Sequence, residues 1–246
     1  MKFTIAIPIH NKGYMIDKII DGLVGSIGTD DVMYSFILDG CTDNSRDVLF
    51  LEAGAKLKNF KITETNNLFQ VKTFNLFMKN FTTDFLILFQ DDMVLKDKTF
   101  LDNIIDLYSI YKDDLGLVGC RDGFGPAYSG MFGSEFSDSK GRVALKNGEH
   151  GEVMMVNIGP IVLTRQLVDK IGYFDELYGI GVYEEMEYSL KCKAAGLTNI
   201  VMGVDLIHSK FLEDAGNIEH TSEDIAKQHP VNYAIFHKRW NHIAKI

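Results

Sequence analysis

Short apolar runs alternate with longer stretches of helical periodicity through the first 120 residues of this chain. Each short run predicts a β-strand, and each longer stretch predicts a helix with one buried stripe. Strands joined by helical crossovers form a mostly parallel sheet, because the crossover has a preferred right-handed path. The alternation therefore predicts an α/β fold with a central, mostly parallel sheet flanked by helices. We expect strands at 3–9, 34–38, 61–63, 85–89 and 115–120, and helices at 13–27, 45–57, 71–81 and 101–111.

The regular alternation stops near residue 121. Residues 121–151 contain seven glycines and little periodicity, which predicts a long loop or an irregular excursion over the sheet. Regular structure returns with an apolar segment at 153–163. The later elements are expected to be a short helix capped by Thr164, a helix at 184–195 that stops before Gly196, strands at 198–202 and 204–207, and a polar helical tail.

Two adjacent carboxylates follow the most apolar of the predicted strands. Phe85–Phe89 is continuously apolar, as in a central parallel strand, and Asp91 and Asp92 come directly after it. Open α/β sheets bind ligands at the carboxyl ends of their strands. Neighbouring carboxylates repel each other unless a cation or hydrogen-bond donors compensate them, and oxygen ligands suit Mg²⁺ or Mn²⁺. The alternative is a solvated loop, because Asp is common in turns.

A second acidic cluster lies at the start of a predicted helix. Glu184 and Glu185 fall in its first turn, where the helix dipole alone favours negative charge. The preceding segment, 172–181, is rich in glycines and aromatic residues that can form a pocket wall. A glutamate shielded by aromatic rings has a raised pKa, which suits a general base.

Charge and cysteine usage exclude several classes of protein. The net charge of −9 and the pI near 5.2 argue against non-specific binding to nucleic acid or anionic lipid, and mean that an anionic ligand needs a local cation. The three cysteines are widely spaced and indicate neither a disulfide framework nor a zinc site. No segment has the roughly 18 apolar residues of a membrane span, and the first residues lack the pattern of a signal peptide. We therefore expect a cytoplasmic protein without an integral membrane segment.

Four separated segments place polar or acidic residues directly after an apolar run or a glycine-rich stretch. They are Phe3–Asn11, Phe36–Ser45, Leu88–Asp92, and Gly172–Glu176 followed by Glu184, Glu185 and His208. In this order and spacing they resemble the signature segments of family 2 glycosyltransferases. The resemblance covers about residues 3–210. It implies the GT-A fold, a single Rossmann-like domain that binds a nucleotide-diphospho-sugar.

The resemblance implies a donor pocket built from the first half of the chain. Asp39 would accept a hydrogen bond from the imide-type N–H of a base, so a UDP-, dTDP- or GDP-linked sugar would fit. The alternative is that Asp39 only shapes the turn with Gly40. Asp91 would contact the ribose or a metal-bound water. The other residues implied to line the pocket are Pro8, His10, Asn11 and Gln90, the last standing where many relatives carry an acid.

The same resemblance implies a divalent cation, Mn²⁺ or Mg²⁺, bound by Asp92 and spanning the donor diphosphate. His208 would complete the protein ligands of the cation, with a structural histidine as the alternative. The segment 67–75 lacks the glycine and arginine often found in relatives. Lys72 would then supply positive charge to the diphosphate, unless it is a solvated helix lysine.

For catalysis, Glu185 is the implied general base, at a position where relatives usually have Asp. It would take a proton from the acceptor hydroxyl as that hydroxyl attacks the anomeric carbon, with Glu184 positioning the acceptor or the base. Direct attack assisted by one base inverts the anomeric centre. The implied activity is therefore an inverting, metal-dependent transfer of a hexose or a related sugar.

The expected organisation is one glycosyltransferase domain over residues 1–215, with a nucleotide-binding half at about 1–120 and an acceptor-binding half at 121–215. Residues 216–246 would form a helical tail packed on the same domain. The acceptor would be a growing glycan or a lipid-linked molecule, and the latter would allow peripheral attachment to a membrane. The alternatives are a catalytically silent nucleotide- or glycan-binding module and a sugar nucleotidyltransferase of the same fold.

Overall fold

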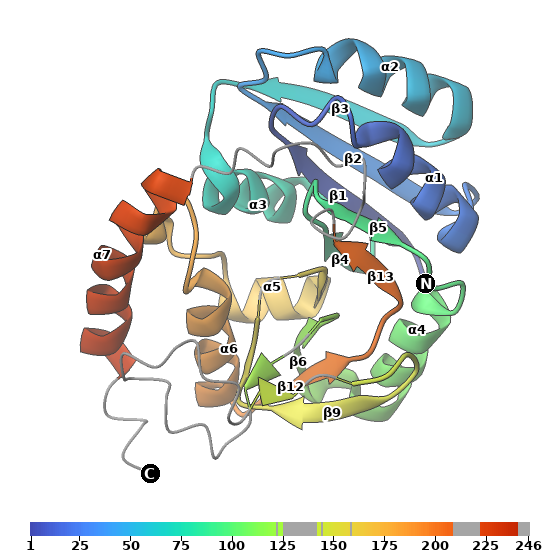
Figure 1. The fold of residues 1–246 in the computed structure, drawn as a ribbon. Coiled ribbons are helices and arrows are strands. Elements are labelled where there is room, and N and C mark those ends of the chain that lie inside the picture. The colour runs from blue at the N-terminus through green and yellow to red at the C-terminus, as the bar shows by residue number, and fades with distance from the viewer. Residues whose placement is uncertain (122, 125–141, 144, 158, 209–221, 241–246) are drawn as a thin grey trace.

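The computed structural model describes residues 1–121, 123–124, 142–143, 145–157, 159–208 and 222–240. These residues form three layers, with a twisted sheet between two layers of helices (Figure 1). The helices are α1 (Ile16–Ile27), α2 (Ser45–Lys56), α3 (Phe69–Asn80), α4 (Phe100–Tyr111), α5 (Arg165–Ile171), α6 (Glu184–Ala194) and α7 (Ser222–Trp240).

The main sheet has eight strands in the order β3-β2-β1-β4-β11-β6-β12-β9. Strands β3, β2, β1 and β4 run parallel, as do β6 and β12, whereas β11 lies antiparallel between β4 and β6, and β9 lies antiparallel to β12. The mostly parallel α/β sheet is as predicted. The strands are β1 (Phe3–Ile9), β2 (Val32–Asp39), β3 (Phe60–Thr65), β4 (Phe85–Leu88), β6 (Leu115–Gly119), β9 (His150–Val153), β11 (Ile161–Thr164) and β12 (Thr198–Met202).

Two apolar cores lie on opposite faces of this sheet. Alternate residues of β1, such as Ile5 and Ile7, pack against α1, α2 and α4, whereas Ala6 faces the core that contains α3, α5 and α6. This alternation follows from the pleat, because successive strand residues point to opposite faces. Helix α7 joins the second core through Phe236, whose ring lies 5.3 Å from that of Tyr183.

Several element boundaries differ from the sequence-based expectations. Helix α1 begins at Ile16 rather than at residue 13, because the backbone N–H groups of Lys12 and Gly13 donate to the side chains of Ser45, the first residue of α2, and Asp43 just before it. The apolar segment 153–163 is divided between the end of β9, β10 (Met155–Val156) and β11. The short helix after Thr164 is confirmed, and the Thr164 hydroxyl accepts a hydrogen bond from the Leu167 N–H at 3.0 Å.

The segment 121–151 lies partly outside the described residues. Its described parts hold β7 (Gly123–Phe124), β8 (Arg142–Val143) and the start of β9. Strand β9 forms one edge of the main sheet, so the expectation of a loop or irregular chain was wrong at that point. The pairing joins β9 to β12, a contact between distant parts of the chain that local periodicity does not record.

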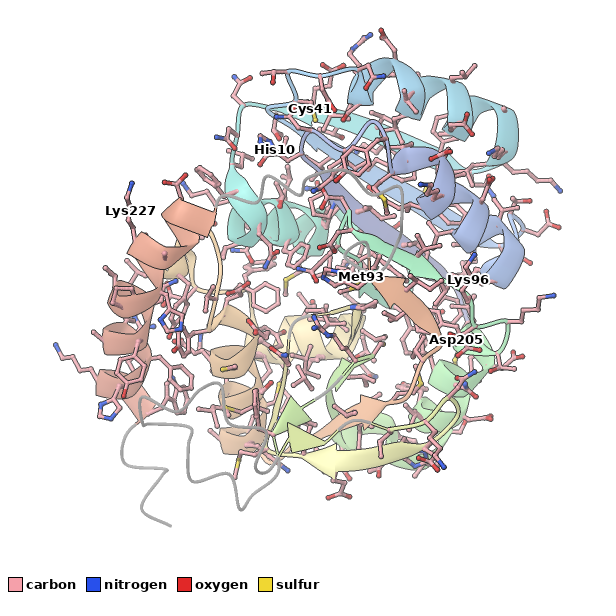
Figure 2. All side chains as sticks on the ribbon, in the orientation of Figure 1. His10, Cys41, Met93, Lys96, Asp205 and Lys227 are labelled. Atoms are coloured by element: carbon pink, nitrogen blue, oxygen red, sulfur yellow. The ribbon has the colours of Figure 1, made fainter. Side chains whose placement is uncertain are left out.

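A small two-stranded ribbon, which the sequence did not predict as a pair, lies beside the main sheet. Strand β5 (Met93–Leu95) pairs antiparallel with β13 (Leu206–His208), and His208 lies opposite Met93. Figure 2 labels Met93 next to β13. The ribbon therefore brings the end of β13 next to the residues that follow β4. Among the described helices, none combines the length and the apolar character that crossing a membrane requires.

Candidate active site

A pocket of about 320 Å³ opens at the carboxyl ends of β1, β2 and β4. The chain runs from β1 to β2 and β3 on one side of β1 and then crosses back to β4 on the other side. Open α/β sheets bind ligands at such a switch point. Of the residues predicted from the sequence, Pro8, His10, Asp39, Gln90, Asp91 and Asp92 line the pocket. The other lining residues are Ile9, Lys12, Asn67, Phe69, Gln70, Thr73, Ile180 and Asp224.

Asp39 lies at the end of β2 and is only 4% exposed. Its Oδ1 accepts hydrogen bonds from the Thr65 hydroxyl at 2.8 Å and the Leu68 N–H at 2.6 Å, and its Oδ2 accepts from the Phe69 N–H at 2.8 Å. Asp39 therefore holds the loop that enters α3. Because a carboxylate can accept about four hydrogen bonds, one acceptor position remains for a ligand.

His10 ties the ends of three strands together. Its backbone N–H donates to Asp91 Oδ2 at 2.9 Å, and its Nδ1 lies 2.6 Å from the backbone oxygen of Asp39. Figure 2 shows His10 at the end of β1 near Cys41, whose thiol donates to the Ile9 oxygen at 3.2 Å. Asn11 instead accepts hydrogen bonds from the backbone N–H groups of residues 42 and 43, and it is not among the residues that line the pocket.

Asp92 and His208 form a close pair at the pocket. Asp92 Oδ2 lies 3.3 Å from His208 Nε2, although the two residues are far apart in the sequence, and Asp92 is only 5% exposed. The β5–β13 ribbon creates this contact. An oxygen and an imidazole nitrogen suit Mn²⁺, which also takes phosphate oxygens and water. Among the described residues no group of three or more His, Cys, Asp or Glu gathers as a metal site, so such an ion would need ligand oxygens as well.

Glu184 and Glu185 begin α6 and are 1% and 2% exposed. Neither lines the pocket directly, but Gln70 connects Glu184 to it. The Gln70 amide donates to Glu184 Oε1 at 2.7 Å, and the Gln90 amide lies 3.4 Å from Gln70 Oε1. Burial raises the pKa of Glu184, an effect opposed by hydrogen bonds that include those from Gln70 and Glu185.

Lys12, which sequence reasoning did not assign to the site, is a lysine that the structure places there. It is 6% exposed and lines the pocket with Asp39, Asp91 and Asp92. Within the described part of the chain its ammonium group contacts the Tyr14 hydroxyl at 3.4 Å and has no carboxylate partner. Lys72, the lysine expected in this role, is exposed on α3 and is not a lining residue. The available sequence signal was that Lys12 directly follows the Pro8–Asn11 turn.

Comparison with solved structures shows which proteins share this fold. The mannosyltransferase PcManGT from Pyrobaculum calidifontis, solved with GDP-Man and Mn²⁺, is 15% identical, with a TM-score of 0.61 over 83% of this chain. TarS from S. aureus (residues 1–349), solved with UDP-GlcNAc, is 18% identical, with a TM-score of 0.57 over 82% of this chain. No protein-family model and no curated protein matches the sequence.

These similarities confirm the predicted GT-A type of α/β fold. The identities are low, so the likeness is one of fold. This chain spans 55% of the PcManGT chain and 56% of the TarS 1–349 chain, little more than half of each.

Proposed function

We propose that this protein is a glycosyltransferase that transfers a sugar from a nucleotide-diphospho-sugar to a hydroxyl acceptor. The observation that carries the proposal is the Asp92–His208 pair at a pocket that Asp39, Asp91 and Lys12 also line. Nucleotide-sugar complexes of proteins with the same fold support it, because GDP-Man and UDP-GlcNAc are the ligands of those structures. Two candidate ligands for a cation and one buried ammonium together suit a diphosphate.

In this proposal the nucleotide lies over the carboxyl ends of β1 and β2. The fourth acceptor position of Asp39 receives the imide N–H of uracil, thymine or guanine. Lys12 contacts the diphosphate, and this contact compensates the burial of an ammonium group that has no carboxylate partner among the described residues. Asp92 and His208 are the residues that would hold a divalent cation, Mn²⁺ or Mg²⁺. When bound, that cation stabilises negative charge on the leaving nucleotide.

Proton transfer is assigned to the two glutamates at the start of α6. Two adjacent buried carboxylates do not easily ionise together, and the raised pKa of Glu184 favours its protonated form. Glu185 is the proposed base, and it takes the proton from the acceptor hydroxyl as that hydroxyl attacks the anomeric carbon. Glu184, held by Gln70, positions the acceptor or the base. One base and direct attack give inversion at the anomeric carbon.

The acceptor is proposed to be a growing glycan or a lipid-linked molecule, bound mainly by residues 121–215, while residues 1–120 bind the nucleotide. The three cysteines are free thiols, which supports a cytoplasmic location, with peripheral membrane attachment where the acceptor is lipid-linked. Residues 216–221 and 241–246 of the proposed helical tail lie outside the described part of the chain. Helix α7, which lies between these two segments in the sequence, contributes Asp224 to the pocket.

The test measures release of nucleoside diphosphate from UDP- and GDP-sugars in the presence of Mn²⁺. We expect turnover by the wild-type protein and a loss of at least about 100-fold in Glu185→Gln, with donor affinity nearly unchanged. Glu187→Gln is the matched control, because Glu187 lies on the same helix and is equally buried but pairs with Arg239 and Lys191. It should lose stability and keep its turnover per folded molecule.

Two outcomes would reject the enzyme assignment. Donor binding without turnover, by wild type and Glu185→Gln alike and with every acceptor class, would identify a silent binding module. Release of pyrophosphate from a nucleoside triphosphate and a sugar phosphate would identify a nucleotidyltransferase instead.

A further inference from the structure

Phe69 adopts a backbone conformation that bulky residues rarely accept. Its φ is 65°, and Asn67, two residues earlier, has φ 52°. The left-handed region crowds the Cβ atom, so an aromatic residue there is strained. Strain of this kind persists only where the surroundings impose it, and it gathers at ligand-binding positions.

The surroundings of Phe69 do impose this conformation. The Asp39 carboxylate accepts hydrogen bonds from both the Leu68 and Phe69 N–H groups, at 2.6 and 2.8 Å. Beneath the loop, Gly40 leaves no room for a side chain, since a Cβ there would lie 2.8 Å from Asn67 Cβ and 2.9 Å from Asn67 N. The end of β2 therefore fixes the bend that orients Phe69.

The strain does not serve to bury the Phe69 ring. Phe69 is 38% exposed and lines the pocket, whereas Phe74 and Phe77 on the same helix are 0% and 4% exposed in the core. A strained, fixed and exposed aromatic ring at a pocket contributes little to folding. It presents a flat apolar face to whatever occupies the pocket.

The position of Phe69 selects one part of the proposed donor. Its N–H bonds directly to Asp39, while the Asp92–His208 pair is linked to Asp39 through His10 and Asp91. In the proposed binding mode the diphosphate lies next to the cation ligands, Asp92 and His208. The base then lies next to Asp39 and Phe69. Every base offers a π-face, and stacking on an aromatic side chain is a common way to bind one.

We propose that Phe69 is a stacking platform for the nucleobase of the donor, oriented by its left-handed backbone on Asp39 and Gly40. The inference rests on the proposed function and adds a binding residue to it. It also explains why a strained backbone occurs at this position, because the stacking contact that offsets the strain forms only when the nucleotide is bound.

The test combines thermal unfolding with calorimetric binding of UDP and GDP, each with Mn²⁺. Phe69→Gly should raise the melting temperature, because glycine accepts a positive φ without strain, yet lower nucleoside diphosphate affinity about tenfold or more. Inorganic pyrophosphate with Mn²⁺, which has no base, should bind Phe69→Gly and wild type equally. A residue needed only for folding would show the opposite effect on stability.

Three controls separate the ring from the strain. Phe69→Tyr keeps both and should retain wild-type affinity, whereas Phe69→Leu keeps the strain without the ring and should lose affinity without gaining stability. Lys112→Gly relieves another left-handed residue, with φ 48°, outside this pocket, and should raise stability alone.

The outcomes distinguish the two proposals. Wild-type binding of UDP or GDP with no loss in Phe69→Gly would overturn the stacking and leave the proposed function intact. An equal loss for pyrophosphate would also overturn it, because the ring would then shape the diphosphate site. Failure of the wild type to bind any nucleoside diphosphate would overturn both.

Discussion

Lys12 is a buried lysine at the pocket whose charge would be compensated by an anionic ligand. Its side chain is buried, yet its ammonium group has no carboxylate partner among the described residues. Burying a charge without such a partner is unfavourable, so the position is retained at some loss of stability. The three acids around the pocket, Asp39, Asp91 and Asp92, would otherwise repel an anionic ligand. Lys12 is thus the cation that the acidic chain needs at this site.

Lys12→Gln should weaken the binding of UDP or GDP about 10- to 100-fold, because one charge-assisted hydrogen bond to phosphate is lost. Melting temperature should stay constant or rise, since a buried charge is removed. Calorimetry on the folded variant measures both effects. Lys72→Gln is the control with the same change of charge on exposed α3, and it should bind as the wild type does. A larger loss of affinity in Lys72→Gln than in Lys12→Gln would show that Lys72, and not Lys12, contacts the phosphate.

Glu184 predicts a pH dependence of stability. Burial raises its pKa above the ordinary value of 4.5, so as pH rises through 4.5 the unfolded chain releases the proton first. The contribution of Glu184 to the free energy of unfolding is therefore greatest below about pH 4.5, and it falls as the pH rises towards the pKa of Glu184 in the folded protein. Glu184→Gln, which can keep the Gln70 hydrogen bond, should match the wild type in acid and exceed it at neutral pH. If the difference in melting temperature between Glu184→Gln and the wild type stayed constant from pH 4 to pH 8, this prediction would be wrong.

At the scale of elements, α7 holds the loop that positions the glutamates. The buried Asn232 amide donates to the carbonyl oxygens of Tyr178, Gly181 and Val182 at 2.8, 2.7 and 3.1 Å. Three residues of this loop have left-handed φ angles, 125° at Gly181, 74° at Val182 and 81° at Tyr183. A β-branched residue in that region needs external support. One side chain on α7 therefore fixes the entry to α6.

Asn232→Asp preserves shape but replaces the donor with a carboxylate facing three carbonyl oxygens. We expect a loss of about 2–3 kcal/mol of stability and a fall of tenfold or more in turnover, because the loop before Glu184 relaxes. Affinity for UDP or GDP should change much less, since the proposed nucleotide contacts, Lys12, Asp39 and Phe69, lie outside this loop. Val231→Ala, the exposed neighbour on α7, is the control and should change neither. Equal losses of affinity and turnover would point to general unfolding.

Element type was predictable from sequence where it is set locally. The apolar run Phe85–Phe89 and the helix that Thr164 caps match the structure closely, because burial pattern and capping act within a few residues. The pairing of β5 with β13 was not predictable, since three-residue strands carry no periodic signal and their partners are distant. The same holds for β11, whose antiparallel place in the sheet depends on the whole topology.

Site residues divide in the same way. Asp39, Asp91 and Asp92 can be recognised in the sequence as acids at the ends of predicted strands, and all three line the pocket. Lys12 and Phe69 carry no such signal. Lys12 is distinguished by a buried ammonium group without a carboxylate partner among the described residues, and Phe69 by a strained φ angle, and only tertiary structure creates these features.

Over the whole molecule, the proposed cation site joins the two halves of the chain. Asp92 follows β4, whereas His208 ends β13, and the three-residue pairing of β5 with β13 brings them together. A ligand that bridges both residues stabilises the folded state by mass action, because the unfolded chain does not hold them together. At a concentration 100 times its dissociation constant, this stabilisation is about 2.7 kcal/mol.

A thermal-shift experiment tests this prediction. UDP or GDP at that concentration with Mn²⁺ should raise the melting temperature of the wild type by about 5–10 °C, given about 2–4 °C per kcal/mol for a chain of this size. Mn²⁺ alone should give a much smaller shift, because two protein ligands leave most of its coordination to phosphate and water. Asp92→Asn should lose the part of the nucleotide shift that depends on Mn²⁺ and keep the part seen with chelator, which Lys12 provides. A full shift in Asp92→Asn would remove Asp92 from the cation site and move the metal-dependent binding elsewhere in the molecule.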